Sequence, residues 1–151
     1  SNLKDSLDIS MLSDATAAID ELKHLELGEQ IWANGQLIYF DASDRGLSGG
    51  IPQNIDSMDS LLLLYISDNF LSGSIPDGIY TLMNLESLHL SGNQLSGEIN
   101  PIFCTQIDNW AIEDFSSIKS SLFDNKFCPG EEGYPVCIEQ FIGEQDTTEC
   151  P

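Results

Sequence analysis

The stretches LSGGIP (47–52), LSGSIP (71–76) and LSGEIN (95–100) are near-copies of one short phrase. Each copy begins 24 residues after the one before it. A fixed period of this length is the signature of a solenoid, because one coil cannot bury its own apolar face and neighbouring coils must cover it. The sequence therefore predicts stacked coils that share one residue pattern.

Aligned at this period, the chain contains three units, at residues 37–60, 61–84 and 85–108. Several columns of the alignment are apolar in every unit, and two of them alternate with intervening residues in the manner of a β-strand. We expect one short strand per unit, paired in parallel with the next strand at ~4.8 Å. The apolar columns, which should face inward, are represented in the first unit by Leu37, Phe40, Ala42, Leu47, Ile51 and Ile55.

A polar residue follows each expected strand, namely Arg45, Asn69 and Asn93. An asparagine at this position can turn inward and satisfy backbone groups where the chain leaves the sheet. Arg45 cannot accept hydrogen bonds, so the first unit is expected to turn differently, as an edge unit.

The units, such as LLLLYISDNFLSGSIPDGIYTLMN (61–84), resemble leucine-rich repeats of the plant-type subclass, whose consensus is LxxLxLxxNxLSGxIPxxIxxLxx. The resemblance covers residues 37–108, and the subclass is not confined to plants. It implies an α/β solenoid, a short curved right-handed coil with a parallel β-sheet on its concave face. It also implies binding of a protein, peptide or glycan, without catalysis.

Both ends of a solenoid expose core and need a cap. We predict an N-terminal cap over residues 1–36, with a helix at about 14–25 and Trp32 over the open core. We predict an irregular fourth repeat and a C-terminal cap over residues 109–151. In that segment SSLFDNKFC (120–128) repeats the strand-and-asparagine pattern, with Asn125 in the place of Asn93.

The four cysteines are Cys104, Cys128, Cys137 and Cys150, and their spacing does not resemble a zinc site. An even count in a small acidic chain favours two disulfides, which staple the C-terminal cap, and an oxidising compartment. Four cysteines allow three pairings. We favour Cys104–Cys128, which would join the last repeat to the segment stacked on it, and Cys137–Cys150, which would close a short tail loop.

The charge balance excludes one class of partner. Five Lys and Arg face 25 Asp and Glu, a formal net charge of −20, and such a surface repels nucleic acid. No apolar run long enough for a membrane span is present in this fragment, and no signal peptide is visible in it. We expect an extracellular or cell-surface location, with a monomer favoured and the oligomeric state left open.

Catalytic and metal-binding motifs are also missing from the sequence, which has neither a G-x-S-x-G nor an H-E-x-x-H motif. A chance pair of carboxylates on neighbouring strands leaves a hydrolase as a minor alternative. We therefore predict a protein that is not an enzyme and has no cofactor or metal.

The outward positions of the strands form the candidate ligand-binding face. These positions include the aromatic residues Tyr39 and Tyr65, and exposed aromatic groups often mark recognition sites. The alternative is an ordinary surface with a few apolar residues. Our hypothesis is an extracellular recognition module, and the alternative is a structural or adhesive spacer within a larger surface protein. The candidate ligand-binding residues are Tyr39, Asp41, Leu63, Tyr65, Ser87, His89 and Phe123.

Overall fold

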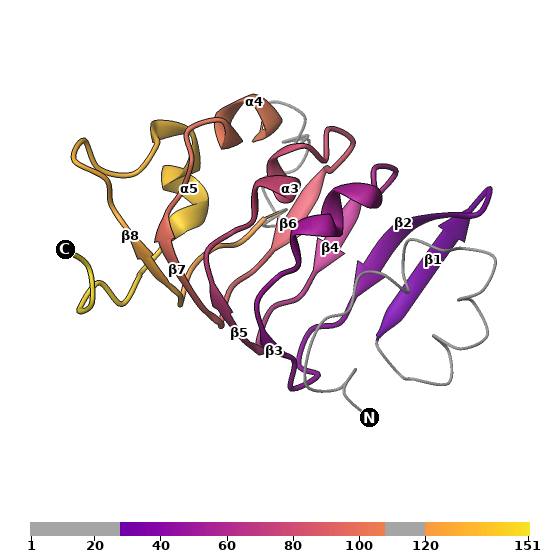
Figure 1. Cartoon of the computed structure of the whole chain (residues 1–151), viewed down its shortest axis with the longest axis horizontal. Helices are drawn as coiled ribbons and strands as arrows, with labels where there is room; N and C mark the ends of the chain where they lie inside the picture. The colour runs from indigo at the N-terminus through magenta and orange to yellow at the C-terminus, as the bar shows by residue number, and fades with distance from the viewer. Residues whose placement is uncertain (1–27, 108–119) are drawn as a thin grey trace.

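The structure, a computed structural model, describes residues 28–107 and 120–151. Within these ranges the chain advances coil by coil from β1 to α5, and successive coils add strands to two sheets (Figure 1). The first sheet contains, in spatial order, β1 (Glu29–Ala33), β2 (Gln36–Asp41), β4 (Leu63–Tyr65) and β6 (Ser87–His89). The second sheet contains β3 (Ser48–Gly49), β5 (Phe70–Gly73), β7 (Gln94–Glu98) and β8 (Lys126–Cys128).

The repeat period sets the register of the first sheet. Strands β2, β4 and β6 are parallel, and each residue pairs with the residue 24 positions further on, so that Asp41 pairs with Tyr65 and Tyr65 with His89. A parallel bridge from His89 to Ser121 continues the ladder into the fourth unit. The predicted parallel strands are therefore confirmed.

Short helices form a further part of each coil. They are η1 (Gln53–Ser57), α3 (Asp77–Tyr80) and α4 (Phe103–Ile107), followed near the C-terminus by η2 (Val136–Ile138) and α5 (Glu139–Ile142). Pro52 and Pro76 of the repeated phrase precede η1 and α3, each with φ of −69°. Proline fits this position because its fixed φ suits the start of a helix and the first N–H groups of a helix have no partner within it.

The core lies between the two sheets and the short helices. All apolar columns of the three units are buried, with Phe40, Leu64 and Leu88 at 0% exposure. The predicted inward direction of these columns is confirmed, and it leaves the alternate residues of β2, β4 and β6 on the opposite face of the sheet.

The asparagine column joins neighbouring coils through side-chain hydrogen bonds, and we call Asn69, Asn93 and Asn125 the asparagine ladder. The Asn69 Oδ1 atom accepts the backbone N–H groups of Arg45 and Leu47, each at 3.0 Å. Its Nδ2 group donates to the carbonyl of Ala42 at 2.9 Å. Each asparagine therefore serves the coil that precedes its own. Among the described units the one that contains Arg45 comes first, so an arginine there leaves this ladder intact.

The asparagine ladder continues toward the C-terminus and ends at Gln145, a residue that is not part of the repeat pattern. Asn93 accepts the N–H of Leu71, and Asn125 accepts the N–H of Leu95, both at 3.0 Å. The predicted equivalence of Asn125 with Asn93 is confirmed. Gln145 then takes the next position: it accepts the Phe127 N–H at 3.1 Å and donates to the carbonyls of Leu122 and Ile142.

At the N-terminal edge the described chain forms a β-hairpin. Strand β1 pairs antiparallel with β2, and the turn between them holds Asn34 and Gly35 with φ of 51° and 73°. Trp32 is half-buried and packs against the core, as predicted. The helix predicted at about 14–25 lies outside the described residues. The domain boundaries at 36/37 and 108/109 stay predictions.

The disulfides pair Cys104 with Cys137 and Cys128 with Cys150, so the predicted pairing of Cys104–Cys128 and Cys137–Cys150 is wrong. Cys104 lies in α4 and Cys137 in η2, and these short helices are in contact. Cys128 ends β8, the last strand of the second sheet, where it pairs with the cysteine next to the C-terminus. Nearness in sequence misled the prediction, because the stacked layers of the coil decide which thiols meet.

Candidate ligand-binding face

Three rings form a continuous row across the first sheet, and we call Tyr39, Tyr65 and His89 the aromatic ladder. The Tyr39 and Tyr65 rings meet edge to face with centroids 5.7 Å apart. The Tyr65 and His89 rings meet in the same way at 4.5 Å. Such pairs contribute about 0.5–1.5 kcal/mol beyond burial. All three residues are partly exposed, so the row is both ordered and accessible.

Three buried serines, which we call the serine row, contact one another, and one of them contacts His89 at the end of the aromatic ladder. The hydroxyl of Ser91 lies 3.1 Å from that of Ser67 and 3.0 Å from that of Ser121. Ser121 in turn lies 2.9 Å from Nδ1 of His89. The imidazole is therefore held between the Tyr65 ring and a hydroxyl, which limits its rotation.

A hollow of about 460 Å³ opens beside Tyr65 and His89, and we call it the first-sheet hollow. Phe123, which is 38% exposed, forms part of its wall. This volume lies in the range of small-molecule and peptide side-chain sites. The lining residues are Ser43, Tyr65, Ser67, Asp68, His89, Ser91, Ser121 and Phe123.

Carboxylates lie at the same face. The Tyr39 hydroxyl donates to Oδ2 of Asp41 at 3.4 Å, and Asp41 Oδ1 accepts the N–H of Ser43 at 2.9 Å. Burial raises the pKa of Tyr39 above its ordinary value, and the Asp41 charge raises this pKa further. Tyr39 is therefore a neutral hydrogen-bond donor at physiological pH. The hollow itself includes Asp68, so its chemistry favours a ligand with a cationic or donor group.

The structure brings most of the predicted site residues to one surface. Tyr39, Asp41, Leu63, Tyr65 and His89 are partly exposed on neighbouring strands. Phe123 follows from the fourth unit and is exposed.

Ser87 shares the register but is only 3% exposed, so the expectation that it is open to a ligand is wrong. Its short side chain does not reach the surface. Asp68 lines the hollow and was missed, although an Asp directly before the ladder asparagine is a turn signal. The φ of 55° at Asp68 shows that turn.

Comparisons with known proteins agree with this fold. Residues 60–82 and 84–106 match the Leucine Rich Repeat family. The chain therefore contains leucine-rich repeats, and their consensus is of the plant type. A comparison with curated proteins finds no match.

Several solved receptors contain a similar fold. The plant peptide hormone receptor RGFR1, in complex with RGF2, is 32% identical with a TM-score of 0.52 over 60% of this chain. A TDR receptor is 34% identical, with a TM-score of 0.52 over 61% of this chain. The Arabidopsis receptor kinase HAESA, in complex with the peptide hormone IDA and the co-receptor SERK1, is 28% identical with a TM-score of 0.51 over 60% of this chain.

These matches cover only 13%, 15% and 14% of the three receptor chains, respectively. The helices within the described ranges include none that is long and apolar enough to cross a bilayer.

Proposed function

We propose that this protein is an extracellular, non-catalytic recognition module that binds an extended peptide across its first sheet. The observation that carries the proposal is the aromatic ladder, whose rings are ordered and partly exposed. Two of its residues, Tyr65 and His89, line the first-sheet hollow together with Phe123. Ordered aromatic groups at a surface are the side chains that most often dominate binding energy.

The similar receptors support a peptide as the ligand. RGFR1 is a plant peptide hormone receptor, solved with RGF2, and HAESA was solved with the peptide hormone IDA. The two disulfides favour the oxidising, extracellular setting in which such receptors meet their ligands.

The geometry indicates which side chains of a peptide would contact which residues of the face. Apolar or aromatic side chains of the peptide would pack on Tyr65 and Phe123, and a basic side chain would face Asp41 or Asp68. Ring contacts and the serine row hold the side chains of the aromatic ladder. These side chains therefore lose little conformational entropy on binding. A neutral glycan carries no cationic side chain to face these carboxylates, so the charge of the face favours a basic peptide.

A display experiment tests the class of ligand. The protein would be panned against a random peptide library, and in parallel against a glycan array and a panel of secreted proteins. We expect enrichment of peptides that combine aromatic and basic residues. Failure to enrich any ligand would contradict the proposal and favour a structural spacer, and selective glycan capture would replace the peptide by a sugar chain.

A further inference from the structure

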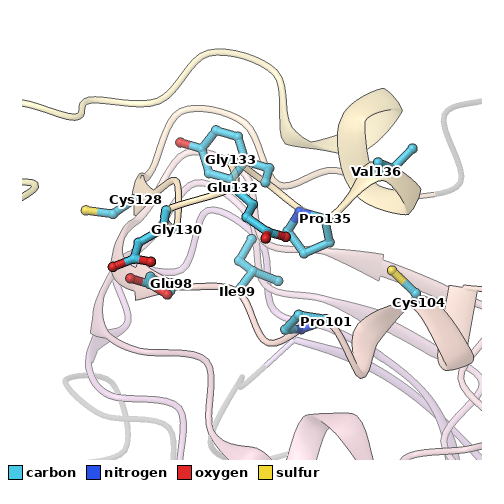
Figure 2. Close-up of a pocket in the computed structure, with 12 residues that line it drawn as sticks. Glu98, Ile99, Pro101, Cys104, Cys128, Gly130, Glu132, Gly133, Pro135 and Val136 are labelled. Carbon is cyan, nitrogen blue, oxygen red and sulfur yellow. The ribbon is translucent and has the colours of Figure 1, made fainter.

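A second and larger cavity lies at the C-terminal cap, and we call it the cap groove. It has a volume of about 760 Å³ and shares no residue with the first-sheet hollow. Figure 2 shows one wall with Glu98, which ends β7, and Pro101, which comes shortly after it. The opposite wall is formed by residues 130–136, which we call the tail loop. Its lining residues are Glu98, Ile99, Pro101, Cys104, Cys128, Gly130, Glu131, Glu132, Gly133, Tyr134, Pro135 and Val136.

The walls of the cap groove are fixed by covalent and hydrogen bonds. The Cys104–Cys137 disulfide ties α4 to the tail loop, directly after Val136. Gly130 and Gly133 exchange two backbone hydrogen bonds, at 3.1 and 3.0 Å, which close a tight turn. The Tyr134 hydroxyl donates to the Phe127 carbonyl at 2.8 Å. The groove is therefore preformed and does not need to order on binding.

Part of the groove is an exposed apolar surface. Val136 is 79% exposed, the highest value among the exposed large hydrophobic side chains of the described residues. Ile99, at 5% exposure, closes the floor between the walls, and Pro101 and Pro135 flank it (Figure 2). An aliphatic side chain held open beside a preformed groove is suited to contact a partner.

The rim of the groove is negatively charged. Glu131 and Glu132 occupy the tip of the glycine-bounded turn and are exposed, and Glu98 lies against the backbone of Gly130 across the groove. Lys126 of β8 forms an ion pair with Glu149, in which Nζ lies 3.8 Å from Oε2. Its charge is therefore directed to Glu149 and not to the rim of the groove. Charge complementarity therefore requires a basic occupant.

We propose that the cap groove is a second binding site, which takes a basic, extended segment of a partner protein. Arginine or lysine side chains of the segment would lie against Glu98, Glu131 and Glu132. An apolar residue next to them would pack on Val136 and the flanking prolines. A free metal ion would not use the apolar wall, so the mixed lining favours a peptide chain.

The test uses synthetic octapeptides that carry two arginines and two leucines, with glutamate in place of arginine in the matched set. Binding to the whole protein is measured by biolayer interferometry. We expect the arginine peptides alone to bind. The variant E98Q/E131Q/E132Q should weaken binding by about tenfold or more, and Val136→Ser by a fewfold.

A matched triple variant separates the groove from general charge attraction. E86Q/E139Q/E144Q removes the same charge from exposed sites outside the groove and should weaken binding less than threefold. Tyr65→Ala/His89→Ala should leave it unchanged. Equal loss in both triple variants, loss in the double variant, or no preference for arginine peptides would overturn the proposal.

Discussion

The ring of Tyr65 lies edge-on to the ring of His89, with 4.5 Å between centroids and 83° between planes. The two residues pair in register on β4 and β6, so the repeat period itself places them side by side. Outward positions do not pack the core, and this pair can therefore be devoted to a ligand at little cost to the fold.

Removal of a ladder asparagine should destabilise the fold. Asn93 accepts the N–H of Leu71 and donates to the carbonyls of Ile66 and Leu90. Asn93→Ala removes the acceptor of the buried Leu71 N–H, while the Ile66 and Leu90 carbonyls keep a second donor in Asn69 and Asn125. Urea unfolding should therefore show a loss of about 1–3 kcal/mol. Asn84→Ala is the control, because Asn84 is exposed and its side chain donates to the Asp59 carbonyl. Equal losses in both variants would contradict the role of the ladder.

Reduction of the disulfides should lower thermal stability. Cys104–Cys137 and Cys128–Cys150 join residues that lie 33 and 22 positions apart at the C-terminal cap. Each bond is expected to contribute about 2–4 kcal/mol, so reductant should lower the Tm by on the order of 10 °C. The double variant Cys104→Ser/Cys137→Ser should give part of this decrease. A melting temperature that does not respond to reductant would show that the cap is stable without its staples.

Moderate salt should stabilise the protein. The net charge of −20 makes like-charge repulsion a destabilising term, and ions screen it. Calorimetry from about 20 mM to about 300 mM NaCl should show a rising Tm. E86Q/E139Q/E144Q should reduce this dependence. A Tm that falls steadily with added salt would oppose the prediction.

Alkaline pH should destabilise the fold through Tyr80. Burial raises the pKa of this phenol, and the nearby Asp77 adds to the shift, although the Asn100 N–H opposes it. The unfolded chain therefore loses its proton first, near an ordinary tyrosine pKa of ~10, and stability falls from that pH up to the raised pKa. Urea unfolding between about pH 9 and pH 11 should show a smaller fall for Tyr80→Phe. Identical slopes would rule out this contribution.

The repeated part of the fold is predictable because its residues obey two simple periods. The 24-residue spacing fixes which residues stack, and the strand alternation fixes which face inward. The core columns, the asparagine ladder and the outward positions of Tyr39, Tyr65 and His89 follow from these rules alone.

The two caps are harder to predict from the sequence, since no repeat constrains them. Asn34-Gly35 is a strong hairpin signal, and it forms the turn between β1 and β2. Likewise Ile142 and Gln145 have the spacing of Leu122 and Asn125, which identifies the last position of the ladder. The disulfide pairing depends on the layer in which each cysteine lies, and sequence distance does not contain this information.

The most direct test of the central claim is the affinity of a selected peptide for the wild-type protein and for Tyr65→Ala/His89→Ala. Phe123→Ala is a second site variant, because its side chain is exposed and is not part of the core. Phe70→Ala is the matched control, since Phe70 is 61% exposed on the second sheet. We predict that isothermal titration shows affinity reduced by about tenfold or more in both site variants and unchanged in the control. Unchanged affinity in the site variants, or an equal loss in Phe70→Ala, would contradict a binding site on the aromatic ladder.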